Sequence, residues 1–148
     1  METLQKLFQD YIAYAGQLRE ETASVKSVLG MRDREIYDAG HKAFDKAVED
    51  WAIGFSREHH SQEELSVALE VILLTAADYA EKSPYWYLCA VQRHAAKLIP
   101  LLDETHCAVL RERFEQQYPN GKLPIQREIQ KLLEAKVPQK KRRFLRFR

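Results

Sequence analysis

Apolar side chains recur along most of the chain in steps of three and four residues, the spacing that places them on one face of an α-helix. From residue 4 to residue 29 this spacing holds over nearly four heptads, and it predicts one long helix over about residues 3–29 that ends at Gly30. The predicted inward positions of that helix are Leu4, Phe8, Tyr11, Ala15, Leu18, Thr22, Val25 and Leu29.

A second set of apolar positions with the same spacing predicts another helix. We expect it to begin near Asp33, because aspartate is a favoured N-cap residue. Its inward positions are Tyr37, His41, Phe44, Val48, Trp51 and Phe55. Beside them runs a row of small residues, Gly40, Ala43, Ala47 and Gly54. Such a row lets a neighbouring backbone approach closely, which would explain two glycines at positions where each costs about 1 kcal/mol relative to alanine.

Caps and prolines mark the next two helices. Ser61 and Glu64 have the spacing of a capping box, so we expect a third helix from residue 61 to about residue 82, and its apolar centre predicts the central helix of a bundle. Ser83 and Pro84 predict the start of a fourth helix that Pro100 breaks or kinks. Its expected inward residues are Leu88, Val91, Ala95 and Leu98, and its expected outward residues are Gln92, Arg93 and Lys97.

Two further helices complete the predicted fold. Asp103 can cap a fifth helix that runs to Tyr118, and Pro124 opens a sixth that ends near residue 136. Their expected inward residues are Cys107, Leu110 and Phe114 in the fifth helix and Ile125, Ile129, Leu132 and Leu133 in the sixth. The predicted fold class is all-α: a compact helical bundle of five to six helices over residues 1–137, followed by a basic, aromatic C-terminal arm over residues 138–148.

Composition narrows the class of protein. A chain of 148 residues that is 45% hydrophobic can bury a substantial core without disulfides or a structural metal. Its longest strongly apolar stretch, residues 67–77, is too short to cross a bilayer, and no signal peptide is recognisable, so a cytoplasmic protein is expected. Cys89 and Cys107 lack the spacing of a metal or redox motif, which favours two buried thiols.

The distribution of charge is uneven along the chain. Residues 1–110 hold 11 Lys and Arg against 18 Asp and Glu, a net charge of −7, whereas residues 111–148 hold 12 against 4, a net charge of +8. Residues 139–148 alone carry six basic and no acidic residues. Basic side chains at this density favour an anionic partner, and a membrane surface is less favoured because the charges do not lie on one helical face.

We therefore expect a non-enzymatic binding or adaptor protein that associates with the backbone of nucleic acid, or with a nucleoprotein complex, through its C-terminal region. Basic residues would neutralise phosphates, and phenylalanines would stack on unpaired bases. The candidate nucleic-acid-binding residues are Lys140, Lys141, Arg142, Arg143, Phe144, Arg146, Phe147 and Arg148 in the arm, and Arg111, Arg113, Arg127 and Lys131 in the two preceding helices.

Two other functions are compatible with the sequence. The first is a protein-interaction module, an inhibitor or an assembly subunit, in which the acidic face of residues 1–110 meets a basic surface of a protein partner. The arm then docks elsewhere or on a second copy in a homodimer. The second is a metal-binding bundle, because Asp38 with His41 and Asp103 with His106 have the i, i+3 spacing of helical metal ligands. We favour a core-facing His41 and an Asp103 that serves as a cap, so no metal, cofactor or catalytic residue is predicted.

Overall fold

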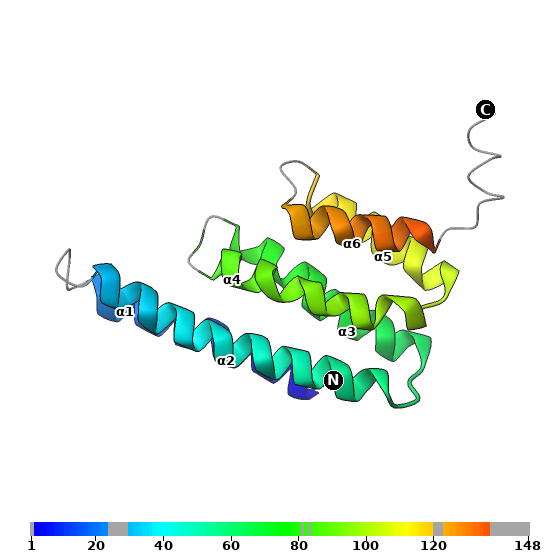
Figure 1. Ribbon diagram of the computed structural model, residues 1–148. Coiled ribbons are helices and arrows are strands. Elements are labelled where there is room, and N and C mark those ends of the chain that lie inside the picture. The colour runs from blue at the N-terminus through cyan, green and yellow to red at the C-terminus, as the bar shows by residue number, and fades with distance from the viewer. Residues whose placement is uncertain (1, 24–29, 81, 83, 120–122, 137–148) are drawn as a thin grey trace.

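The computed structural model describes residues 2–23, 30–80, 82, 84–119 and 123–136, and the side chains among these outside residues 21–38. All secondary structure in this part of the chain is helical, which confirms the predicted all-α fold (Figure 1). The elements are α1 (Glu2–Ala23), α2 (Gly30–Ser56), α3 (Gln62–Leu74), η1 (Thr75–Tyr79), α4 (Tyr85–Ala90), η2 (Val91–Lys97), η3 (Ile99–Leu101), α5 (Glu104–Gln117) and α6 (Pro124–Ala135), where η denotes a 3₁₀ helix. The predicted extension of the first helix over residues 24–29 and the arm over 138–148 lie outside the described residues.

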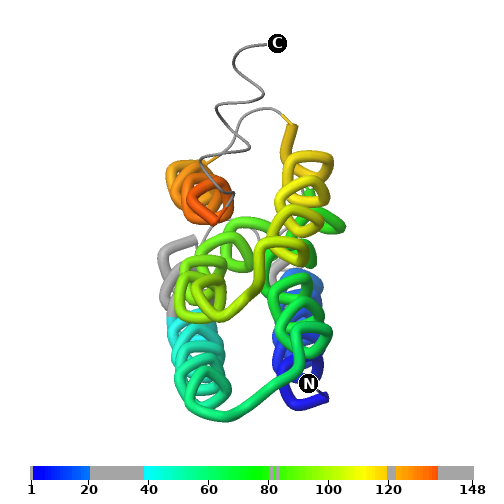
Figure 2. Tube along the Cα trace, turned by 90° about the vertical axis from the view of Figure 1, so that its right-hand side faces the viewer, coloured from blue at the N-terminus to red at the C-terminus, as the bar shows by residue number. Residues whose placement is uncertain are grey.

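The helices form three layers of paired elements (Figures 1 and 2). One outer layer is the hairpin of α1 and α2, and the other outer layer is the pair α5 and α6. Between them lie α3 and the segment from α4 to η2: α3 contacts both α1 and α5, and η2 contacts both α2 and α6. The middle layer is thus covered on two sides, which matches the prediction of a central third helix. No described helix is both long enough and apolar enough to span a membrane.

The core is continuous through the three layers. It contains most of the predicted inward positions, and its largest fully buried side chains are Phe114, Leu4, Leu69, Ile72, Leu73, Leu88, Leu98, Ile99, Leu102, Leu110, Ile129 and Leu133. Aromatic contacts join the outer hairpin to it: Tyr11 stacks on Phe44 with ring centroids 4.3 Å apart, and Tyr87 of α4 meets Tyr11 edge-on at 6.4 Å. Tyr87 therefore packs against the core, whereas the neighbouring Trp86 is 64% exposed.

Two predicted caps are confirmed. The Ser61 hydroxyl accepts a hydrogen bond from the Glu64 amide at 3.1 Å, and Asp103 Oδ1 accepts one from the His106 amide at 2.8 Å. The other half of the predicted capping box is replaced, because the Glu64 carboxylate instead contacts His60 Nδ1 at 2.9 Å.

Two predicted helix starts are wrong. Helix α2 begins at Gly30, so Asp33 lies inside it and is not its cap. Glycine carries little penalty at a helix end, where its backbone is not yet fixed on both sides. Helix α4 begins at Tyr85 with Pro84 as its N-cap residue, one position later than predicted, and Ser83 lies outside the described residues.

The third and fourth helices also end as 3₁₀ turns, in η1 and η2, where continuous α-helices were predicted. The carbonyl of Leu73, at the end of α3, accepts hydrogen bonds from Gln92 Nε2 at 3.0 Å and from the Tyr118 hydroxyl at 2.8 Å. These side chains thus hydrogen-bond to a carbonyl that would accept from a backbone amide in a continuous α-helix. The carbonyl lies where the chain changes from α-helix to 3₁₀ helix.

Three predicted faces need correction. Gln92 was expected to point outward and is fully buried, because η2 is enclosed by neighbouring helices and its amide finds partners there. Leu132 was expected inward and is 38% exposed, since Ile129 and Leu133, one turn apart, already define the buried face of α6. In the small-residue row, a Cβ at Gly40 would overlap the Tyr14 ring, but one at Gly54 would meet no described atom within 4 Å, so close packing explains only the first glycine.

Candidate functional site

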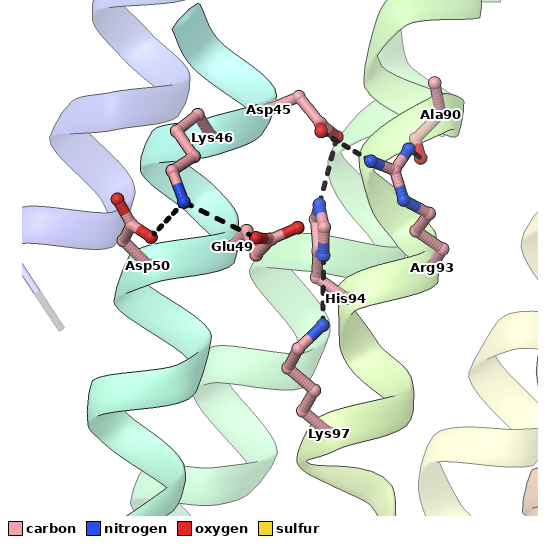
Figure 3. Close-up of polar contacts among 8 residues, drawn as sticks. All are labelled: Asp45, Lys46, Glu49, Asp50, Ala90, Arg93, His94 and Lys97. Atoms are coloured by element: carbon pink, nitrogen blue, oxygen red, sulfur yellow. Dashed lines mark hydrogen bonds and ion pairs between the residues drawn. The ribbon is translucent and has the colours of Figure 1, made fainter. Parts of the chain in front are cut away.

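Charged side chains join α2 to η2 around the buried ring of His94, which is 1% exposed (Figure 3). His94 Nε2 lies 3.0 Å from Asp45 Oδ1, and Lys97 Nζ lies 3.4 Å from His94 Nδ1. Arg93 donates to Asp45 Oδ2 and, at 3.2 Å, to the carbonyl of Ala90. A chain of polar contacts therefore runs from Lys97 through His94 and Asp45 to Arg93, and we call these four residues the ionic network.

Local helix geometry brings these groups together. In a 3₁₀ helix, side chains three residues apart are eclipsed, which aligns His94 with Lys97 on one side of η2. Asp45 on α2 lies between the buried positions Phe44 and Val48, so its carboxylate reaches the interface while its side chain stays 16% exposed. His94 is not among the candidate residues predicted from the sequence. The available signal was its spacing, three residues after the inward position Val91 and four before the inward position Leu98.

The partners determine the protonation state of His94. A carboxylate only accepts hydrogen bonds and an ammonium only donates them, so the neutral ring carries its proton on Nε2 and accepts at Nδ1. Burial lowers the pKa of His94 below its ordinary value; Arg93 and Lys97 act in the same direction, and Asp45 opposes them. The ring is therefore neutral at pH 7.

Glu49 extends this cluster by one helical turn. It lies four residues after Asp45 on α2, its carboxylate points toward the His94 ring, and its side chain is 34% exposed (Figure 3). Its ion pair with Lys46 is long, at 3.7 Å, and Lys46 is closer to Asp50, at 3.1 Å. Donor atoms of Asp45, Glu49 and His94 all lie within 4.8 Å of one another.

A second polar cluster lies deeper, on another side of η2, and contains only uncharged groups. Gln92 Nε2 donates to the Leu73 carbonyl at 3.0 Å and to the Tyr118 hydroxyl at 3.2 Å, and Gln92 Oε1 accepts from Gln126 Nε2 at 3.3 Å. Gln126 Oε1 accepts from the Leu123 amide at 3.0 Å, at the start of α6. Gln92, Tyr118 and Gln126 are each at most 5% exposed, and we call them the neutral network.

Both cysteines are free, buried thiols, as predicted. Cys89 Sγ accepts from Gln126 Nε2 at 3.5 Å, and Cys107 Sγ donates to the Leu133 carbonyl at 3.4 Å. Burial raises the pKa of Cys89 to about 11 and also raises that of Cys107. A cysteine must be a thiolate to act as a nucleophile or a metal ligand, and neither side chain is a thiolate near neutral pH.

A shallow apolar groove of about 550 Å³ follows the outer hairpin between α1 and α2. It is lined by Leu7, Asp10, Tyr11, Tyr14, Ala39, Gly40, Ala43, Phe44 and Ala47. Tyr14 is 40% exposed, and the small side chains of α2 keep the groove open beside it.

The structure places the four basic helix residues in two elements, Arg111 and Arg113 in α5 and Arg127 and Lys131 in α6. Arg113 is ion-paired with Glu70 of α3, and Arg111 is half-buried. Arg127 and Lys131 are exposed one turn apart on α6. Within their bounds, α5 and α6 together hold four basic and five acidic residues, so the positive excess of residues 111–148 comes from Lys122, Lys136 and the six basic residues of 139–148. The candidate residues of the arm lie outside the described residues.

The two Asp-x-x-His pairs do not form a common cluster among the described residues. Asp103 serves as the cap of α5 and contacts His106 Nδ1 at 2.7 Å. His41 is half-buried against Tyr87, with ring centroids 4.9 Å apart, and the side chain of Asp38 lies outside the described part. The donor cluster of the structure is a different one, formed by Asp45, Glu49 and His94.

No family model, no curated protein and no solved structure matches this chain.

Proposed function

We propose that this chain is a non-enzymatic binding protein that associates with nucleic acid, or with a nucleoprotein complex, through its basic C-terminal region. The observation that carries the proposal is the composition of residues 139–148, with six basic residues, no acidic residue, two phenylalanines and one leucine, against a net charge of 17 − 22 = −5 for the rest of the chain. Neutralising phosphates releases counterions, and the phenylalanines can stack on unpaired bases.

The layered fold is compatible with this role. Helix α6 belongs to the layer farthest from α1 and α2, and Lys136 at its end donates to the Pro100 carbonyl at 3.0 Å (Figure 1). The helix that precedes the basic segment in the sequence is therefore anchored in the layer opposite the hairpin, whose helices hold six basic and ten acidic residues.

The test uses the full chain and a fluorescent single-stranded oligonucleotide in an anisotropy titration. Replacing the six basic residues of 139–148 by glutamine is expected to weaken binding by about 100-fold or more, because most phosphate contacts are lost. The matched control, Lys6→Gln with Lys42→Gln, removes two exposed cations of the hairpin of α1 and α2 and is expected to change the affinity less than about threefold. Phe144→Ala with Phe147→Ala separates stacking from charge, and it should weaken single-strand binding more than duplex binding.

Equal binding by the wild type and the six-glutamine variant would refute the proposal. A larger loss in the hairpin control than in that variant would also refute it, because the site would then lie outside the C-terminal region.

The groove on the hairpin favours a second candidate function, the docking of a partner helix. Its lining is almost entirely apolar and the surrounding hairpin is acidic, so the occupant that fits is an amphipathic helix whose apolar stripe is flanked by basic residues. We expect a synthetic Leu/Lys helix to bind, Ala43→Arg to abolish binding, and Ala13→Arg, on an exposed face of α1 outside the lining, to leave it unchanged. Equal effects of the two arginines would refute this docking, and light scattering of the same proteins reports whether a second copy is the occupant.

A further inference from the structure

Three metal-ligating side chains converge where α2 faces η2 (Figure 3). Asp45 and Glu49 lie one turn apart on α2, and His94 faces them from η2, with donor atoms of all three within 4.8 Å of one another. Tetrahedral ligands with bonds of about 2.1 Å lie about 3.4 Å apart, so an ion requires the outermost donor to approach by up to about 1.4 Å. Glu49 has the freedom to make that approach, because its side chain is 34% exposed and its ion pair with Lys46 is long.

The other two donors are held in place by their surroundings. His94 is 1% exposed, and its ring nitrogen Nε2 faces Asp45 Oδ1. Arg93 holds Asp45 through the other carboxylate oxygen, Oδ2, so that Oδ1 remains directed toward the ring. Hydrogen bonds of this kind to the far side of a ligand orient it, and they are a regular feature of protein metal sites.

We propose that Asp45, Glu49 and His94 form a binding site for a divalent first-row transition ion of the Zn²⁺ or Co²⁺ type. One imidazole nitrogen and two carboxylate oxygens suit such ions, and three protein ligands leave a coordination position for water. These residues differ from the Asp-x-x-His pairs that the sequence suggests, and the site is independent of the nucleic-acid proposal.

The ion competes with a proton and with the Lys97 ammonium. The neutral His94 ring carries its proton on Nε2, the nitrogen that faces Asp45, so an ion that binds Nε2 requires this proton to move to Nδ1. Lys97 Nζ, 3.4 Å from Nδ1, then loses its acceptor and withdraws into water, because Lys97 is exposed, whereas Arg93 stays on Asp45 Oδ2. Removing the ammonium of Lys97 is therefore expected to strengthen ion binding. A purely structural network would gain no affinity for a metal from that change.

The experiment titrates untagged full-length protein, freed of metal with a chelating resin, with ZnCl₂ by calorimetry and with CoCl₂ by absorption at pH 7.5. We expect one ion per chain with tetrahedral Co²⁺ bands. Glu49→Gln should weaken binding by about tenfold or more, while the control Asp50→Asn, an exposed acid beside it on α2, should leave binding within about twofold. Lys97→Met should tighten binding by about threefold or more because a like charge is removed. Circular dichroism confirms that each variant is folded.

Absence of binding by the wild type at 100-fold molar excess of either ion overturns the proposal. It is equally overturned if Glu49→Gln binds as tightly as Asp50→Asn, because the ion would then occupy other residues such as His59 or His106. Weaker binding by Lys97→Met also contradicts the proposal, because the Lys97 ammonium is proposed to oppose metal binding.

Discussion

The neutral network and the ionic network around η2 each satisfy a buried polar side chain, but with different kinds of partner. Gln92 and His94 are two residues apart, and both are buried, at 0% and 1% exposure. Gln92 is satisfied by a carbonyl, a hydroxyl and a second amide, all uncharged. His94 is satisfied by a carboxylate and an ammonium that reach it from partly exposed positions.

This difference separates a structural network from a responsive one. The neutral network closes on itself in the middle of the bundle, and burial raises the pKa of Tyr118 far above its ordinary value, so no member changes charge near neutral pH. The ionic network depends on charges at the edge of the interface between α2 and η2. It should respond to pH and to added ions, whereas the neutral network should respond only to substitution.

The largest effect is expected from the neutral network. Gln92→Ala removes a fully buried side chain and, with it, the Gln92 Oε1 atom that accepts from Gln126, so we expect the free energy of unfolding to fall by about 3 kcal/mol. Urea denaturation at pH 7 measures the change. A loss below about 1 kcal/mol would show that the network does not hold α3, η2 and α6 together.

A smaller loss is expected from the ionic network. Asp45→Asn leaves Arg93 without its carboxylate, but that guanidinium is 48% exposed and water replaces much of the lost contact. We expect a destabilisation of about 1.5 kcal/mol in the same assay. If Asp45→Asn proved more costly than Gln92→Ala, the ranking of the two networks would be reversed.

The next prediction concerns pH. Because burial lowers the pKa of His94 in the folded protein, the unfolded chain binds a proton there more readily. The free energy of unfolding should therefore decrease as the pH falls through the ordinary histidine pKa of about 6.5, and this contribution should level off below the lowered folded-state pKa.

His94→Gln should reduce this pH dependence, and Gln92→Ala should leave it unchanged. Denaturation curves collected between pH 7.5 and pH 5 test both variants. Identical pH profiles for the wild type and His94→Gln would show that His94 is not the titrating group.

The smallest effect is expected at the surface. Arg113 and Glu70 join α5 to α3, but their side chains are 51% and 33% exposed, and exposed pairs contribute little. Arg113→Gln should cost less than about 1 kcal/mol, and 0.5 M NaCl should reduce the difference from the wild type. A thermal melt with and without the salt provides the measurement.

Residues whose role depends on the nearest turn were predictable from the sequence. Ser61 and Asp103 cap helices through amides three residues away, and the inward spacing of Leu88, Val91 and Ala95 holds in the structure. Such features follow from local hydrogen bonding and from helical periodicity alone. The all-α fold follows from the same information.

Residues whose role depends on distant parts of the chain were not predictable. Gln92 is polar and was expected outside, yet its partners Leu73 and Tyr118 lie 19 and 26 residues away. His94 meets Asp45, 49 residues away, and neither spacing nor residue type reveals that pairing. The same long-range contacts coincide with the 3₁₀ turns that the sequence did not reveal.

The central claim, that the basic segment binds a phosphate backbone, is tested most directly by the salt dependence of oligonucleotide affinity in the full chain. If the six cations of residues 139–148 each neutralise one phosphate of a single strand, a plot of log K against log salt concentration has a slope of about −4. We expect that slope for the wild type. A slope shallower than about −1 would contradict it.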